Sequence, residues 1–351
     1  MDSDFRPEYL RLRRRNMLFI AVCLLLVVAA VLITLGMGVY NISIPDAISA
    51  WWNHLTGGYV NPRDDAYVWD GRFPRAIMAA FAGAGLAIGG AVMQSVLKNP
   101  LTDPYTMGVS SGAFFGAVLW IICGFSLFPF LSGDLASIAN AFVFSLIPVG
   151  IILILSRYKR ITPTAMVLIG VAIMYVFSSF TQYFMVTADS SSLAEAYSWR
   201  VGTLADASWD NVPYVVVSVT VLSAVLIVLS RRINVLSMND NYAQTLGENV
   251  QKSRVLLLVI VSLMTASIVS FTGTIGFVGL VCPHVVRMFT GSNSKYLIPA
   301  SAVFGALFLV AIDSIAKVTG VNGLPVGVVS ALIGGPVFAY LLIKSRRSVW
   351  M

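Results

Sequence analysis

Long stretches without a charged residue restrict the fold of this chain more than any other feature. Nine stretches contain no Asp, Glu, Lys, Arg or His, and the shortest of them is 17 residues long. A helix needs ~20 apolar residues to cross hydrocarbon about 30 Å thick, so each stretch can supply one membrane-spanning helix. They cover residues 16–45, 76–97, 104–133, 135–156, 161–188, 211–230, 255–283, 296–312 and 318–343. The sequence therefore predicts an all-α integral membrane protein.

The composition agrees with a membrane protein and disfavours a soluble one. Of the 351 residues, 58% are hydrophobic and 11% are charged, whereas soluble domains carry roughly 25% charged residues. The formal net charge of +7 does not indicate nucleic acid, because the basic residues flank the apolar stretches instead of gathering on one face. No nucleic-acid partner is expected.

The seventh stretch is unlike the others because its second half carries Gly273, Gly276 and Gly279 and ends at Pro283. A straight single helix is disfavoured there, so we divide it near Thr272–Gly276 and expect about ten spans. The helix from Gly276 to Arg287 would be only about 17 Å long, too short to cross alone. Irregular backbone at membrane depth is tolerated only inside protein or beside a water-filled cavity. The segment therefore indicates a pore wall.

The distribution of basic residues supports ten spans over nine. With ten spans and an inner N-terminus, 18 of the 23 Lys and Arg residues lie on the inner side, whereas nine spans leave 14 inside and 9 outside. Cytoplasmic loops are enriched in Lys and Arg. The inner set is Arg6 to Arg15, Lys98, Arg157 to Arg160, Arg231 to Arg254, Arg287, Lys295 and Lys344 to Arg347. Both termini are expected in the cytoplasm.

We interpret residues 16–344 as one ten-helix membrane domain, between an inner N-terminal segment (1–15) and an inner tail (345–351). Four arginines precede an uncharged stretch of 30 residues at 16–45. Such a stretch is too long for the apolar part of a signal peptide and has no clear cleavage site. The first span is therefore expected to be retained.

Three loops are expected to be large. Two lie on the outer side, at about 41–72 and 189–210. The third is the inner loop 231–254, in which Asp240 to Leu246 can form a short amphipathic helix. This inner helix would lie below the membrane.

The residues themselves indicate neither a nucleotide site nor a metal site. Gly247 to Ser253 lacks the spacing of a phosphate-binding loop and does not follow a strand. Cys282 and His284 lie two residues apart, but no third and fourth ligand is near, so zinc is disfavoured. The three cysteines lie in apolar stretches and form no CxxC pair. No cofactor is expected in this chain.

Several glycine- and proline-rich segments follow one another along the sequence. They are Arg72-Phe-Pro-Arg75, Ala82 to Gln94, Asn99-Pro-Leu-Thr-Asp-Pro104, Gly108 to Ala113, Gly273 to Arg287 and Leu324 to Pro336. In this order and spacing, over nearly the whole chain, they resemble the FecCD-type permeases of ABC importers for ferric siderophores, haem and cobalamin.

The resemblance implies an architecture and partners. Such permeases are ten-helix type II importer subunits of the cell (inner) membrane with both termini in the cytoplasm. They pair with a second permease, identical or paralogous, and bind two ATPase subunits and an extracytoplasmic substrate-binding protein. The chain would then be no enzyme, since ATP and Mg are bound by the ATPase. Ferric siderophore is the first expected substrate, and cobalamin and haem stay open.

The resemblance also implies an outer docking set, composed of Arg72, Arg75 and Lys317, that forms salt bridges to acidic residues of the binding protein. Exposed rim charges of this kind mainly steer docking. The alternative is anchoring to lipid headgroups. Asp313 is expected to pair with Lys317 at i+4, at the outer interface.

On the inner side, Ala243-Gln-Thr-Leu-Gly247 resembles the helix that couples the permease to the ATPase. We assign Asp240, Ala243, Leu246 and Gly247 to this coupling segment, with an ordinary solvated loop helix as the alternative. Thr162-Pro163-Thr164 matches the loop that closes the pore at the cytoplasmic side. A plain turn after Arg157–Arg160 explains that loop equally well.

Two further segments are assigned through the family. Trp199 to Leu204 resembles a Trp-x-x-Gly-Ser-Leu segment near the outer mouth, although Trp199 can equally be an interfacial anchor. The second segment is the pore and helix-packing motif, formed by Gly276, Gly279, Pro283, His284 and Arg287.

Two other function classes were weighed from the residues. An ion-coupled secondary transporter usually carries ionisable or unwound elements near the midplane, and the first six spans and the tenth carry no charge there. A membrane-embedded enzyme would need a His, Asp or Ser constellation that the spans do not display. Transport that requires ATP and an added ATPase subunit would separate these classes.

Overall fold

The computed structural model describes residues 5–158, 161–320 and 323–345, and all regular elements within these ranges are helices. The predicted inner tail 346–351 and Lys159–Arg160 lie outside the described residues. The helices are α1 (Phe5–Leu35), α2 (Ile44–Thr56), α3 (Pro62–Asp65), η1 (Ala66–Arg72), α4 (Phe73–Val96), η2 (Pro104–Met107), α5 (Val109–Cys123), α6 (Asp134–Tyr158), α7 (Pro163–Thr187), α8 (Ser190–Val201), α9 (Val212–Val228), α10 (Ser230–Ser237), α11 (Asp240–Thr245), α12 (Val250–Thr272), α13 (Val278–Thr290), α14 (Ser294–Val318) and α15 (Val326–Ser345).

The membrane-spanning character predicted from the apolar stretches is confirmed. Seven helical segments of the described residues are long and apolar enough to cross a membrane, and α9 with α10 makes an eighth although the pair is bent by 60°. The apolar helices α5 and α13 are shorter, at 15 and 13 residues. Every one of the ten predicted spans therefore contains a helix, but length alone identifies seven to eight of them.

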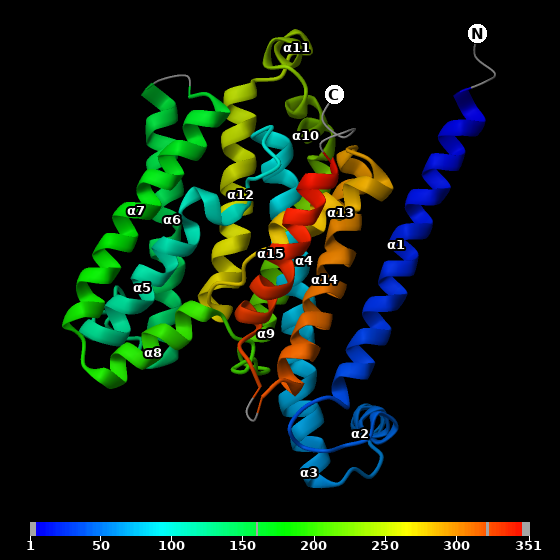
Figure 1. Ribbon diagram of the computed structural model, residues 1–351, viewed down its shortest axis with the longest axis vertical. Helices are drawn as coiled ribbons and strands as arrows, with labels where there is room; N and C mark the ends of the chain where they lie inside the picture. The colour runs from blue at the N-terminus through cyan, green and yellow to red at the C-terminus, as the bar shows by residue number, and fades with distance from the viewer. Residues whose placement is uncertain (1–4, 159–160, 321–322, 346–351) are drawn as a thin grey trace.

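The two ends of the helix bundle carry different short helices. In Figure 1, α1 begins and α15 ends at the same end as α10 and α11, whereas α2, α3 and α8 lie at the opposite end. We name these the inner end and the outer end, after the orientation that the charge pattern predicts. Each end gathers one group of the candidate site residues.

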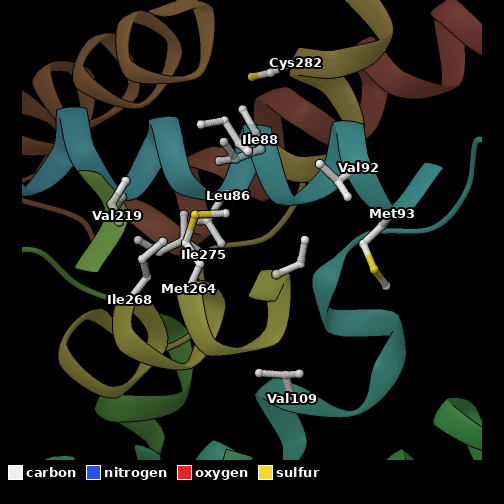
Figure 2. Packing of buried hydrophobic residues seen from close by; sticks show 14 of the residues in the cluster. Leu86, Ile88, Val92, Met93, Val109, Val219, Met264, Ile268, Ile275 and Cys282 are labelled. Atoms are coloured by element: carbon white, nitrogen blue, oxygen red, sulfur yellow. The ribbon is translucent and has the colours of Figure 1, made fainter. Parts of the chain in front are cut away.

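Helix α4 is the centre of the subunit. It packs against α9, α12, α13 and α14, and Figure 2 shows Leu86, Ile88 and Val92 of α4 above Met264 and Ile268 of α12. Small residues allow this crowding. The Cβ of any other residue at Gly83 would meet the carbonyl of Gly305 in α14, and one at Gly90 would meet the carbonyl of Gly279 in α13.

Helix α1 lies at the side of the bundle (Figure 1) and packs mainly along α14. Most of its apolar side chains are exposed, among them Leu18 and Leu25. In a membrane such a surface faces lipid. The helix begins at Phe5, before the predicted start of the span at Asn16, because arginines do not interrupt a helix.

The predicted division of the seventh stretch is confirmed. Helix α12 ends at Thr272, Gly273 has φ +65°, and α13 begins only after Phe277, whose φ is +68°. Other parts of the chain bind the irregular backbone: the amide of Ile275 donates to the Tyr105 hydroxyl at 3.3 Å. Ile275 is buried in protein, whereas Gly276 and Phe277 are partly exposed, and irregular backbone at this depth is tolerated inside protein or beside a water-filled cavity.

The structure adds detail to three of the predicted segments. The outer loop 41–72 is largely helical, since it contains α2 and then α3 and η1, which continue into α4. The loop 189–210 contains α8. Within the stretch 104–133, the short η2 is followed by α5, which ends at Cys123 because Gly124 adopts φ +62°. Absence of charge identified the apolar stretches without identifying the turns inside them.

Candidate functional site

The outer docking set forms one side of a single pocket at the outer end. Arg72, Arg75 and Lys317 line a cavity of about 380 Å³ together with Tyr40 and Tyr67. The two tyrosine rings are stacked, with 4.3 Å between their centroids. The three cations come from the end of η1, the first turn of α4 and the last turn of α14, so the fold brings together residues 245 positions apart, Arg72 and Lys317.

Asp313 holds two of these cations. Arg75 donates from Nε and Nη2 to its carboxylate at 2.8–3.1 Å, and Lys317 Nζ lies 3.3 Å from Asp313 Oδ2. Lys317 also donates to the Thr34 hydroxyl of α1 at 3.2 Å. The predicted i,i+4 pair of Asp313 and Lys317 is confirmed, and Arg75 is an additional partner that sequence spacing could not reveal.

Arg72 is held by backbone carbonyls. Its Nη1 donates to the carbonyl of Leu35 at 2.7 Å, and its Nη2 donates to the carbonyl of Tyr40. The expectation of exposed rim charges was therefore wrong, because Arg72 is only 7% exposed, Lys317 only 6% and the Arg75 side chain 18%. Buried charges require such partners. Docking to a binding protein stays a prediction.

At the inner end, the predicted amphipathic helix is present as α11. The side chain of Asn239 caps it by accepting from the amide of Asn241 at 3.0 Å, and Gly247, with φ +81°, follows its end. Ala243 is fully buried, whereas Tyr242 is 55% and Leu246 is 56% exposed. The helix thus presents large apolar side chains to its surroundings. Its coupling role stays a prediction.

Asp240 binds to the bundle, although its side chain is 37% exposed. Its carboxylate accepts from Lys98 Nζ at 2.6 Å and from Arg254 Nη2 at 3.0 and 3.1 Å. Partial burial raises the pKa of Asp240, but hydrogen bonds and charge from Lys98 and Arg254 outweigh it and hold that pKa below its usual range. Sequence reasoning missed Lys98 and Arg254 as functional candidates, since they are 142 and 14 positions from Asp240.

The gate segment lies beside α11. Thr162 is the N-cap of α7 and accepts from the amide of Ala165 at 3.2 Å, and Pro163 occupies the first helical position. These features make the segment a helix start, which is the plain interpretation of its residues. Thr162, Asp240 and Arg254 nevertheless line one pocket of about 320 Å³. Thr164 is exposed next to it.

The pore and helix-packing motif joins α13 to α4. Arg287 Nη1 donates to Gln94 Oε1 at 3.1 Å, and Gln94 Nε2 donates to the carbonyl of Gly279 at 3.3 Å. Pro283 and His284 are buried in α13, and the His284 ring meets Phe338 of α15 edge-on at 6.3 Å. These residues therefore act as packing residues here.

Gly276 differs from the rest of that motif, because no heavy atom lies within 4 Å of the position that a Cβ would take. The residues that the structure describes contain no group of three or more His, Cys, Asp or Glu placed to hold a metal ion.

The outer-mouth segment connects three helices. The amide of Thr203 donates to the carbonyl of Thr272 at 2.9 Å, and the amide of Gly327 donates to the carbonyl of Gly202 at 3.1 Å. The Trp199 indole stacks on Phe114 at 5.8 Å. Helix α8 is therefore attached to the end of α12 and to the start of α15, and the partly buried Trp199 packs against Phe114 of α5.

Comparison with known proteins connects these features to a family. The FecCD transport family matches residues 25–344. The molybdate import system permease of Haemophilus influenzae is 31% identical over 329 residues, 92% of this chain and 94% of the relative. The cobalamin import system permease of Halobacterium salinarum is 40% identical over 278 residues, 77% and 72% of the two chains. The Fe(3+)-citrate import system permease of Bacillus subtilis is 32% identical over 338 residues, 96% and 98%.

A solved structure has the same fold. It is described as an inward-facing conformation of a metal-chelate type ABC transporter and superimposes with a TM-score of 0.82 at 28% identity, covering 93% of this chain and 98% of that one. The family expected from the glycine-rich segments is confirmed. The chain belongs to the FecCD transport family, whose members are the multi-pass permease subunits of ABC transporters and leave ATP hydrolysis to a separate subunit.

Proposed function

We propose that this chain carries a ferric siderophore through the inner cell membrane as the permease subunit of an ABC importer. Its family and the solved relative make it an importer permease for metal chelates, and the iron chelate is the finer proposal. The observation that carries it is the 32% identity, over 96% of the chain, with a permease named for Fe(3+)-citrate.

Cobalamin is the second candidate substrate. The relative named for cobalamin import is 40% identical, although over the smaller share of 77% of the chain. Haem, which the sequence left open, and molybdate, which another relative is named for, belong in the same test. The side chains that contact the substrate select among these compounds. In the proposed assembly, these side chains come from the pair of permease subunits.

The proposed assembly contains a second permease, identical or paralogous, two ATPase subunits and a substrate-binding protein. The exposed Tyr242 and Leu246 of α11 support contact with an ATPase, because large apolar side chains at a water-facing end favour a protein partner. At the outer end, the pocket lined by Arg72, Arg75 and Lys317 supports docking of an acidic partner. ATP and Mg are bound by the partner.

Transport by the reconstituted assembly tests the function. In proteoliposomes that contain the permease, its ATPase and its binding protein, we expect uptake of a radiolabelled ferric siderophore only with ATP and Mg. Cobalamin, haem and molybdate serve as parallel substrates, and a non-hydrolysable ATP analogue serves as the control. Uptake by this chain alone under a proton gradient would show an ion-coupled secondary transporter instead.

The orientation is tested separately by cysteine labelling. In a Cys123→Ser background, which removes the exposed native thiol, Tyr59→Cys marks the outer end and Tyr242→Cys marks α11. We expect a membrane-impermeant maleimide to label the first variant in intact cells and the second only after permeabilisation. Labelling of Tyr242→Cys in intact cells would reverse the proposed orientation.

A further inference from the structure

Helix α11 contacts the rest of the bundle through the buried Ala243 and through one charged side chain. Asp240 is the only charged residue of this six-residue helix. Its carboxylate meets Arg254 Nη2 with both oxygens and Lys98 Nζ with one, at 2.6–3.1 Å. The other end of α11 is exposed at Leu246. The helix therefore exposes apolar side chains to a partner, and its one charged side chain forms ion pairs with the bundle.

Arg254 connects this attachment to two transmembrane helices. It lies in the first turns of α12 and is only 2% exposed. Its Nε also donates to the carbonyl of Val96, at the end of α4, at 3.3 Å. A buried guanidinium has a fixed position, since each partner restricts it. Movement of Asp240 therefore acts directly on the inner ends of α4 and α12.

Lys98 extends the connection toward the gate segment. It follows α4 with φ +52°, a conformation that only a minority of non-glycine residues adopt. The chain then continues into η2, which packs against α7 so closely that a Cβ at Gly170 would meet the carbonyl of Thr106. Helix α7 begins at the gate residues Thr162 to Thr164. Asp240 thus connects α11 to Lys98, from which the chain leads through η2 to the packing contact with α7.

We propose that Asp240 is a positioning residue that transmits the displacement of α11 to α4, α12 and the gate segment, and that it does not contact the ATPase. The proposal rests on the proposed function, because it takes the ATPase as the source of that displacement. It changes the role expected for Asp240 and adds Lys98 and Arg254 to the coupling machinery. Tyr242 and Leu246 keep the contact with the ATPase.

The test compares ATP hydrolysis with transport in the complete assembly in proteoliposomes. For Asp240→Asn, which keeps the size of the side chain but removes its charge, we expect hydrolysis within about twofold of wild type and about tenfold fewer substrate molecules carried per ATP. The Asp240→Glu variant restores the charge and is expected to recover most of the transport per ATP. A residue that only stabilises the fold would lower both rates together.

Two further variants separate the ion pair of Asp240 from the partner-facing surface of the coupling segment. Lys98→Met removes one cation at a partly exposed position and is expected to lower transport per ATP less than Asp240→Asn. Leu246→Ala, on the partner-facing side, is expected to weaken ATPase binding and reduce hydrolysis and transport in parallel. Unchanged transport per ATP in both Asp240→Asn and Lys98→Met would overturn the proposal. Absence of ATP-driven uptake by the wild-type assembly would instead overturn the proposed function.

Discussion

Replacement of Asp313 by Asn is expected to lower the free energy of unfolding by about 3–5 kcal/mol, because it leaves the buried Lys317 and the partly buried Arg75 without their carboxylate. Asp313 is almost fully buried and accepts from both Arg75 and Lys317. In a thermal unfolding experiment on detergent-purified protein of this length, a loss of this size corresponds to a decrease of about 5 °C in Tm.

The control for this prediction is the same substitution at an exposed position. Asp70→Asn, on the exposed side of η1, is expected to change the stability by less than about 0.5 kcal/mol. The double variant Asp313→Asn/Lys317→Met removes one of the unpaired cations and is expected to recover part of the loss. Equal Tm values for Asp313→Asn and Asp70→Asn would show that the outer cluster contributes nothing to stability.

Replacement of Gly90 by Ala is expected to destabilise the protein by about 3 kcal/mol, because one methyl group would separate α4 from α13. The added Cβ would overlap the carbonyl of Gly279, and backbone of a buried helix cannot move aside as a flexible side chain can. The measurement is the yield of monodisperse protein after extraction, together with its Tm.

Gly150→Ala is the matched control in another helix. Gly150 lies inside α6, and no heavy atom is within 4 Å of its would-be Cβ. Because alanine has the higher helix propensity, this variant is expected to be at least as stable as wild type. If Gly90→Ala were as stable as Gly150→Ala, the close approach of α4 and α13 would not be required for the fold.

The sequence predicted those parts of the fold whose causes are local. Absence of charge over ~20 residues is sufficient to identify a spanning helix, and the glycines after Thr272 identified the break between α12 and α13. The pair of Asp313 and Lys317 is one helical turn apart. The signals for α2 were also local but were overlooked: Ser43 caps the helix and Pro45 lies in its first turn.

The parts that could not be predicted depend on contacts between distant segments. Arg75 and Asp313 are 238 positions apart, and the partners of Arg72 are backbone carbonyls, which no residue type signals. The helix preceding α4 was missed because Asp64, Asp65 and Asp70 interrupt the apolar stretch without interrupting the helix. The contacts of Asp240 with Lys98 and Arg254 likewise depend on where α4 ends and where α12 begins.

The central position of α4 has a consequence for biosynthesis. Its partners α9, α12, α13 and α14 all follow it in the chain, and Arg75 meets Asp313 only after 238 more residues have been made. At ~5–20 residues per second, the ribosome needs roughly 10–50 s for that distance. During this interval the glycine-lined surface of α4 and the guanidinium of Arg75 must be sheltered by the insertion machinery or by the headgroup region. Nascent chains released before α14 are therefore expected to be degradation substrates.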